Sequence, residues 1–379
     1  MTSSTAARAE AGARGATSAT TMPRVMLVDD SGVSRALMAR WLTEAGVEIV
    51  AQARNGEEAR DTIVAANPDI VLLDIEMPRL GGIDVLPHLL KRVPGVKIVM
   101  VSTLSRRNAR ITIEALRAGA TDALAKPDSG WAGTSAPAFR DELVRKVRDL
   151  GEADTVAVAI PDVAPRPWPQ RVVQKPSPPA SPVKARGSTG IVVIGSSTGG
   201  PNALFTMLKH LPSSPAVPIL IAQHMPPMFT SILGEHITRL TGISAAEAKH
   251  REPVVPGRIY IAPGGRHMSM SGGPKHPLIC ISDDPPENFC RPSVNPLFRS
   301  AASGWGENAF GIVLTGMGSD GLDGARALKA VGAQVMVQDA ASSVVWGMPG
   351  SVFNAGLADA VMDLDGLGTF LATELGAMA

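Results

Sequence analysis

VMLVDDSGVSR, residues 25–35, decides how the first part of this chain folds. Four apolar residues run into two acids, Asp29 and Asp30, and the apolar spacing after Ser31 then changes to the period of a helix. A short buried strand, a turn and an amphipathic helix make up the repeating unit of a parallel α/β sheet. The stretch therefore predicts a first strand that delivers acidic side chains to one edge of such a sheet.

The same alternation continues outward from this stretch to residue 150. Helix-period and strand-like segments take turns, and the helices are punctuated by Ser31 before the first and by Asn67-Pro68 after the second. Such alternation predicts a doubly wound parallel sheet of the flavodoxin-like kind over residues 23–150. The strands are expected at 25–28, 49–53, 70–73, 97–101 and 123–125, and the helices at 33–45, 57–66, 108–118 and 139–150.

The flanking segments differ in composition. Residues 1–22 are rich in Ala, Thr, Ser, Gly and Arg and lack the apolar core of a signal peptide, so we expect a disordered leader in which Met22 is a candidate true start. Eight prolines fall between 161 and 182, which predicts an extended, semi-rigid linker over 151–188.

A second α/β pattern fills residues 189–379, and we expect a Rossmann-like parallel sheet there. Its helices are expected to lie between short apolar runs, as in the first pattern. The strands are expected at 191–194, 219–223, 260–262, 278–281, 311–314 and 334–337, and the helices at 203–211, 230–240, 322–331 and 364–375.

The overall composition excludes several classes of protein. The formal net charge is +1 over 379 residues, which argues against a general binder of nucleic acid or of a membrane surface. No apolar run approaches the roughly 20 residues of a membrane span, so direct membrane insertion is not expected. The two cysteines, Cys280 and Cys290, form neither a zinc pattern nor a disulfide framework, and a reducing cytoplasm is expected.

Five polar side chains stand at predicted strand ends in the first pattern. Because the carboxyl ends of parallel strands meet at one edge, three carboxylates, a hydroxyl and an ammonium group should gather there. Oxygen ligands favour Mg²⁺ among the carboxylates, and a central Asp can form an aspartyl-phosphate. A helix cap is the alternative reading of Asp29-Asp30, and a turn is the alternative reading of Lys126-Pro127. The residues are Asp29, Asp30, Asp74, Ser102 and Lys126.

Four motifs in this region resemble the response-regulator receiver family: VMLVDDSGVSR, LLDIEMPRLGGIDVL (72–86), VMVST (99–103) and GATDALAKP (119–127). The resemblance implies that a histidine kinase phosphorylates Asp74 and that Asp29 and Asp30 help to hold Mg²⁺. It also implies that Ser102 and Lys126 sense the phosphoryl group. Ala123 stands where receivers commonly place a switching aromatic residue, so the coupling of Ser102 to such a residue is expected to be altered or absent.

The second pattern has a candidate nucleophile. The strand at 191–194 runs into a glycine-rich turn, Gly195 to Pro201, that carries Ser197; its spacing fits neither G-x-G-x-x-G nor a P-loop. A nucleophile turn and a merely structural glycine turn remain the two readings. His224 ends the next strand and can act as the base, and Asp320 follows the strand at 311–314 as its orienting carboxylate. Asp323 is a rival for that last role.

These segments are similar to the chemotaxis protein-glutamate methylesterase family. The resemblance also covers SSPAVPILIAQHMPP (213–227), IYIAPGGRHM (259–268), RPSVNPLF (291–298), GIVLTGMGSDG (311–321) and VVWGMPG (344–350). Ser196 departs from the family, which commonly has Ala there; Ser197 is assigned because it precedes Thr-Gly-Gly. Backbone N–H groups near Thr198 or Met317 are expected to stabilise the oxyanion.

The resemblance implies a hydrolase, activated by phosphorylation and requiring no cofactor for hydrolysis, that demethylates glutamate methyl esters and deamidates glutamines on chemoreceptors. A histidine kinase and methylated chemoreceptors would be its partners. Three alternatives remain: a response regulator with a non-catalytic binding output domain, a general esterase for small molecules, and Cys290 as the nucleophile. The absence of a basic stripe argues against nucleic-acid output.

Overall fold

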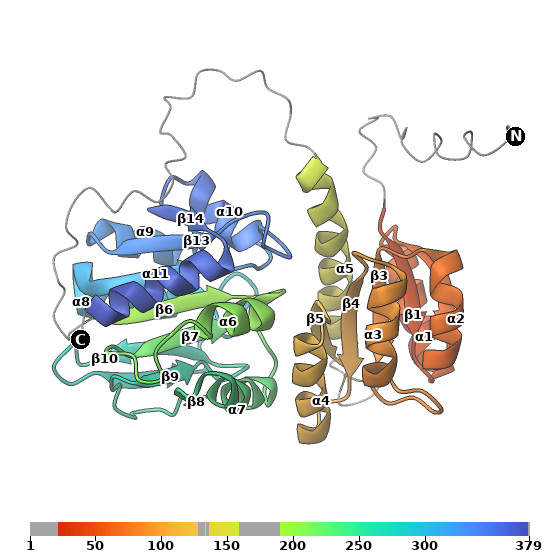
Figure 1. Ribbon diagram of the computed structural model, residues 1–379, viewed down its shortest axis with the longest axis horizontal. Coiled ribbons are helices and arrows are strands. Elements are labelled where there is room, and N and C mark those ends of the chain that lie inside the picture. Colours follow the sequence, from red (N-terminus) through yellow and green to blue (C-terminus); the bar gives the residue numbers. More distant parts are fainter. Residues whose placement is uncertain (1–21, 128–132, 134–135, 159–189, 378–379) are drawn as a thin grey trace, which may run out of the picture.

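The computed structural model describes residues 22–127, 133, 136–158 and 190–377, arranged around two parallel sheets (Figure 1). The predicted leader, apart from Met22, lies outside the described residues, as does the linker from 159 to 188. Among the helices that are described, none has the length and apolar character needed to cross a bilayer.

The first sheet confirms the flavodoxin-like prediction. Its five parallel strands follow the order β2-β1-β3-β4-β5. Helices α2, α3 and α4 pack on one face, while α1 and α5 cover the other. The strands are β1 (Arg24–Val28), β2 (Glu48–Ala53), β3 (Ile70–Asp74), β4 (Lys97–Ser102) and β5 (Asp122–Ala125), and the helices are α1 (Gly32–Glu44), α2 (Gly56–Ala66), α3 (Gly82–Arg92), α4 (Arg106–Arg117) and α5 (Ala136–Val158).

Local capping explains where these helices begin, and two differences from the sequence prediction have local causes. The Ser31 side chain accepts a hydrogen bond from the Ser34 amide, as an N-cap does.

Helix α3 was missed because Pro87 interrupts its pattern. Helix α5 continues to Val158, so the predicted linker start at 151 is wrong. No proline or further glycine stops the helix between 152 and 158, and the first proline is Pro161.

The second sheet is also entirely parallel and has the order β14-β13-β12-β6-β7-β9-β8. An antiparallel hairpin, β10-β11, lies beside it. The strands are β6 (Ile191–Ser196), β7 (Ile219–Gln223), β8 (Ser244–Glu247), β9 (Arg258–Ile261), β10 (His267–Ser271), β11 (Leu278–Ser282), β12 (Ala309–Val313), β13 (Gln334–Gln338) and β14 (Ala360–Met362).

Helices cover both faces of this sheet, as a doubly wound fold requires. Helices α6, α7 and α11 pack on one face, and α8, α9 and α10 pack with the hairpin on the other. The sequence prediction missed α8 because Pro292 and Pro296 flank its start, although proline is tolerated in a first turn. It also missed β8, β10, α10 and β14. The helices are α6 (Gly200–Leu208), α7 (Phe229–Thr241), α8 (Val294–Trp305), α9 (Leu322–Ala330), α10 (Gly347–Asn354) and α11 (Leu364–Ala377).

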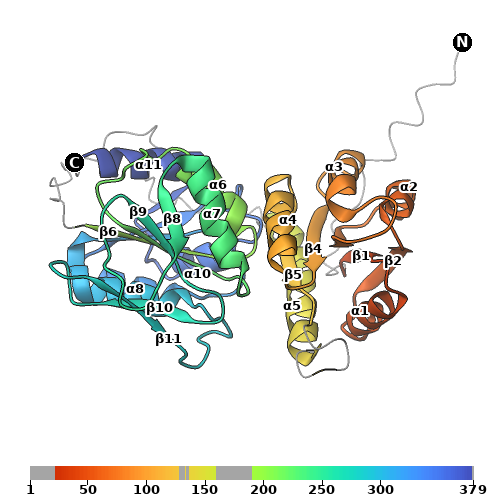
Figure 2. The same ribbon diagram turned by 90° about the horizontal axis from the view of Figure 1, so that it is seen from below.

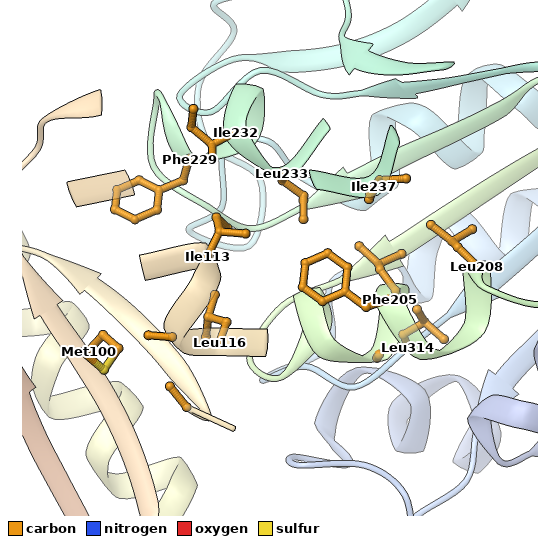
Figure 3. Close-up of a cluster of buried hydrophobic side chains, with 14 of the residues drawn as sticks. Met100, Ile113, Leu116, Phe205, Leu208, Phe229, Ile232, Leu233, Ile237 and Leu314 are labelled. Carbon is orange, nitrogen blue, oxygen red and sulfur yellow. The ribbon is translucent and has the colours of Figure 1, made fainter. Parts of the chain in front are cut away.

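The two units pack against each other through α4, which lies beside α6 and α7 (Figure 2). Ile113 and Leu116 of α4 belong to one apolar cluster with Phe205 of α6 and with Phe229 and Ile232 of α7 (Figure 3). Each of these five side chains is at most 7% exposed. Burial of this kind contributes roughly 25 cal/mol per Å² of apolar surface, so the contact holds the first unit on the second.

Candidate active site

Three predicted residues leave the second sheet from neighbouring strands. Ser197 directly follows β6, His224 directly follows β7, and Asp320 lies in the loop after β12. Strand β6 lies between β7 and β12, and the chain builds the sheet outward from β6 in both directions. Ligands of open α/β sheets bind beyond the carboxyl ends of the strands at such a switch point.

His224 and Asp320 are in direct contact, since His224 Nε2 lies 2.8 Å from Asp320 Oδ2. Ser197 lines the same cavity as these two residues and is 8% exposed. The cavity has a volume of about 550 Å³. An alcohol, an imidazole and a carboxylate thus share one partly enclosed space.

The start of α8 holds Asp320 in place. Asp320 Oδ1 accepts a hydrogen bond from Ser293 Oγ at 2.7 Å, and Oδ2 accepts one from the Val294 amide at 2.7 Å. Burial alone would raise the pKa of Asp320, but His224 and these two donors lower it below its usual value. Asp320 therefore remains a carboxylate beside the imidazole. Ser293 and Val294 were not identified from the sequence, because their role depends on the missed helix.

The imidazole of His224 has two hydrogen-bonding neighbours, Asp320 and Cys290. Burial alone would lower the pKa of His224, but hydrogen bonds to Asp320 and to the Cys290 sulfur raise it to about 9. The imidazole of this arrangement therefore favours the protonated form at neutral pH.

Residues of the first unit cover the cavity. Asp122, Ala123 and Lys146 form part of its wall, together with Ser197 and His224 of the second unit. Ala123 is the position where the family resemblance leads one to expect an aromatic residue. The remaining lining residues from the first unit are Ala125, Glu142, Arg145 and Asp149.

One hydrogen bond links the first unit directly to the loop that carries Ser197. Thr198 Oγ1 donates to Asp122 Oδ2 at 2.8 Å, and both side chains are buried. Lys146 Nζ bonds the same carboxylate oxygen. Thr198, which follows Ser197, is therefore tied to β5 of the other unit.

Three further hydrogen bonds cross the same interface. Glu235 of α7 accepts from Arg106 Nη2 at 2.6 Å and from Arg110 Nη2 at 3.2 Å, both on α4. Asn202 Nδ2 of α6 donates to the Ala120 carbonyl at 3.1 Å. The arginine pairs are exposed and are worth at most about 1 kcal/mol each, so apolar burial dominates the contact.

A separate charged cluster lies at the carboxyl edge of the first sheet. Asp29, Asp30 and Asp74 each offer a carboxylate oxygen, and these oxygens lie within 4.8 Å of one another. Lys126 Nζ lies 2.8 Å from Asp29 Oδ2 and 2.8 Å from Asp74 Oδ2. Burial raises the pKa of Asp74 to about 6, and the nearby Lys126 only partly offsets this.

Ser102, the fifth predicted residue of this cluster, is fully buried at the end of β4. Its Oγ lies 3.3 Å from Oγ1 of Thr112 on α4. Thr112 in turn donates to the Asn108 carbonyl of the same helix. Ser102 therefore contacts the helix that packs on α6 and α7.

Comparison with known proteins gives both units a family. The CheB methylesterase model matches residues 192–371, and the response regulator receiver domain model matches residues 25–130. A Caulobacter vibrioides protein named protein-glutamate methylesterase/protein-glutamine glutaminase 2 is 46% identical, covering 94% of this chain and 100% of that relative. The chain belongs to the protein-glutamate methylesterase/protein-glutamine glutaminase family.

A second relative and a solved structure are also similar in sequence to this chain. A Rhodospirillum centenum protein-glutamate methylesterase/protein-glutamine glutaminase of group 2 operon is 44% identical over 92% of this chain and 93% of its own length. The crystal structure of the Thermotoga maritima CheB methylesterase catalytic domain is 36% identical, with a TM-score of 0.48, and covers 50% of this chain and 98% of that structure.

Ser196, where the family resemblance leads one to expect Ala, has a structural role. Ser196 is fully buried, and its Oγ donates to Gln223 Oε1 at 2.6 Å. Gln223 Nε2 also donates to the Ser197 carbonyl at 2.9 Å and so joins the loops after β6 and β7. The Ser196 hydroxyl is thus buried and hydrogen-bonded to Gln223, whereas Ser197 lines the cavity. Gln223 carries no motif that would have revealed this role.

The remaining predicted residues of the methylesterase part are also placed. Met317 lines the cavity in the loop that carries Asp320, and the Thr198 carbonyl accepts from Thr315 Oγ1 at 3.0 Å. Asp323, the rival carboxylate, is exposed and pairs with Arg326 at 2.6 Å. Asp323 is not among the residues that line the cavity.

Proposed function

We propose that this chain is a phosphorylation-controlled hydrolase that removes methyl esters from glutamates of chemoreceptors and deamidates glutamines at the same kind of site. One observation carries the proposal: Ser197 shares a cavity with a bonded His224–Asp320 pair, and a receiver covers that cavity. The names of the relatives supply the substrate class.

Ser197 is the nucleophile in this scheme. Only the neutral form of His224, which is the minor form at neutral pH in the receiver-covered arrangement, can act as the base. With Nε2–H donating to Asp320, the other ring nitrogen of this neutral form accepts the proton of Ser197 Oγ. The hydroxyl oxygen attacks the ester carbonyl, and Asp320 stabilises the imidazolium that forms. His224 then returns the proton to the leaving methoxide, and methanol departs.

The second half of the reaction uses the same groups. Water, deprotonated by His224, attacks the acyl-serine and restores the glutamate carboxylate. Backbone N–H groups near Thr198 and Met317 are the proposed donors to the oxyanion, and each such donor typically contributes about 10²–10³ in rate. A glutamine side chain passes through a similar tetrahedral intermediate and releases ammonia.

A histidine kinase is the proposed phosphodonor, with Asp74 as the acceptor. The carboxylates of Asp29, Asp30 and Asp74 suit Mg²⁺, which prefers oxygen ligands. Bound there, the ion would offset the charge of the phosphoryl group. Lys126 Nζ, which lies 2.8 Å from Asp74 Oδ2, is placed to pair with a phosphoryl oxygen. Ser102 is the proposed hydrogen-bond donor to the phosphoryl group.

Control follows from the covering receiver. Because Asp122 and Lys146 of the receiver line the cavity, the covering receiver would keep a receptor helix from Ser197. Phosphorylation would draw Ser102 away from Thr112 and disturb α4, the helix that holds the receiver on α6 and α7. With Ala123 in place of an aromatic switch, α4 and the Asp122–Thr198 bond are the proposed points of coupling.

Methanol release from methylated receptor membranes tests the proposal. The full-length protein should be slow without a phosphodonor and faster with one, and the fragment 189–379 should be active under both conditions. Equal full-length rates with and without the phosphodonor would remove the regulatory claim. The non-catalytic alternative predicts no methanol release and no labelling of Ser197 by a reactive-serine probe.

A further inference from the structure

Cys290 adds a third ligating group to the His224–Asp320 pair. One ligand atom each from His224, Cys290 and Asp320 lies within 4.8 Å of the other two. The cysteine is a free thiol, partly exposed, and lines the cavity that contains Ser197. Ester hydrolysis as proposed above leaves this sulfur without a role.

The donor set matches a particular class of metal ion. Imidazole nitrogen, thiolate sulfur and carboxylate oxygen are the three ligand types that Zn²⁺ takes in proteins, and three protein ligands leave a fourth position for water. The remaining cluster of metal-ligating groups in the part of the chain that the structure describes is the oxygen-only set of Asp29, Asp30 and Asp74, which suits a harder ion.

The surroundings of Asp320 favour a metal site as well. Ser293 Oγ and the Val294 amide donate to its carboxylate and fix its orientation. Such outer hydrogen bonds orient ligating groups in metal sites, and their loss typically lowers metal affinity 10–100-fold. Asp320 is therefore already oriented by contacts that metal binding leaves in place.

We propose that His224, Cys290 and Asp320 form a binding site for one Zn²⁺ ion, and that its occupancy reversibly blocks the active site. Zn²⁺ binding is independent of the proposed hydrolase function, whereas the block of the active site rests on that function. The fourth ligand is water from the cavity.

The proton balance explains why binding blocks hydrolysis. Zn²⁺ takes the thiolate of Cys290, whose proton leaves to solvent, together with the Asp320 carboxylate and one ring nitrogen of His224. A neutral imidazole has one unprotonated nitrogen, so a metal-bound ring carries its proton on the other. Neither nitrogen then has a free lone pair to accept the proton of Ser197, and the pair with Asp320 is interrupted.

The first test measures metal binding in the full-length protein after chelator treatment. Zn²⁺ is titrated in competition with a chromophoric chelator at neutral pH. The wild type should bind one equivalent at this site, and Cys290→Ala should bind it at least ~100-fold more weakly through the loss of a direct ligand. Cys280→Ala is the matched control, because Cys280 lies on the hairpin strand β11 and bonds Ser271.

Co²⁺ gives a spectroscopic readout that does not depend on activity. Coordination by a thiolate adds a sulfur-to-metal charge-transfer band, and four-coordination adds intense visible absorption. Both signals should appear in the wild type and in Cys280→Ala and be lost in Cys290→Ala and His224→Ala. Their absence from the wild type, or their persistence in Cys290→Ala, would overturn the site.

The second test measures methanol release, with each variant compared with its own metal-free rate. Zn²⁺ should inhibit the wild type and Cys280→Ala, a chelator should restore the rate, and Cys290→Ala should require at least ~100-fold more Zn²⁺. If Zn²⁺ binds but the rate of methanol release is unchanged, the proposed block is overturned and the proposed metal site stands. If no variant releases methanol, the hydrolase proposal fails, and the titration and the spectra still judge the metal site.

Discussion

The two sheets of this protein use the same architecture for different chemistry. At the receiver edge, Asp29 and Asp74 flank the single ammonium group of Lys126, all within one sheet. At the methylesterase edge, the Asp320 carboxylate that contacts His224 is held by α8, a helix on one face of the sheet. In both cases a parallel sheet brings strand-end side chains together at one edge. The packing around that edge decides which of these side chains form hydrogen bonds or ion pairs with one another.

This difference has a consequence for charge. The receiver cluster is a charged pocket in which burial keeps the pKa of Asp74 raised, to about 6. At the other edge, donors from α8 and the imidazole lower the pKa of Asp320. The anionic form of Asp74 is therefore destabilised, which suits the proposed phosphorylation site. The anionic form of Asp320 is stabilised, which suits a carboxylate that is proposed to remain ionised beside His224.

The largest effect is expected at the nucleophile. Ser197→Ala should lower methanol release by roughly 10⁶-fold, as removal of a triad serine does elsewhere. Ser196→Ala is the matched control on the adjacent residue. It removes one hydrogen bond to Gln223 and should cost less than about 10-fold. Similar losses in the two variants, assayed with the fragment 189–379, would contradict the assignment.

The orienting carboxylate should come next. Asp320→Asn should lower the rate roughly 10⁴-fold, because the amide cannot stabilise the imidazolium. Asp323→Asn, three residues away and exposed, should change the rate less than about twofold. If Asp323 proved the more sensitive site, the distinction between the cavity carboxylate and the helix carboxylate would be wrong.

A smaller effect is expected at the receiver edge. The folded-state pKa of Asp74 is raised from 3.8 to about 6, so its favourable contribution to stability is present below pH 4 and is lost as the pH rises through 6. Asp74→Asn should therefore stabilise the receiver by on the order of 2 kcal/mol at pH 8, and by less at pH 5. Amide hydrogen exchange of β1 and β3 in the full chain measures this. A destabilised variant at pH 8 would show that the Lys126 pair dominates.

The smallest effect is expected at the contact between the two units. Asp122→Ala removes the bond to Thr198, worth about 1 kcal/mol, together with the bond to Lys146 within the receiver, and should raise the unphosphorylated full-length rate about fivefold. Asp141→Ala, an exposed substitution on α5 away from the cavity, should leave that rate unchanged. An equal rise in both variants would argue against Asp122 as a point of coupling.

Strand ends were readable from the sequence, but helix α8, whose start is flanked by Pro292 and Pro296, was not. Asp29, Asp74, Ser197 and His224 were all selected because each follows a short apolar run, and the ends of parallel strands share an edge. Helix α8 was missed, and with it the two groups that hold Asp320. Asp122 and Gln223 were missed because their partners lie 76 and 26 or 27 residues away in the sequence.

The sequence by itself determined two α/β units and the side chains offered at their strand ends, because strand and helix periods are local properties of the apolar pattern. The tertiary structure decided which of those side chains meet. It set Asp320 rather than Asp323 against His224, brought Cys290 to the same imidazole, and laid the receiver over Ser197. These contacts depend on strand order and on packing between distant segments, which no local pattern encodes.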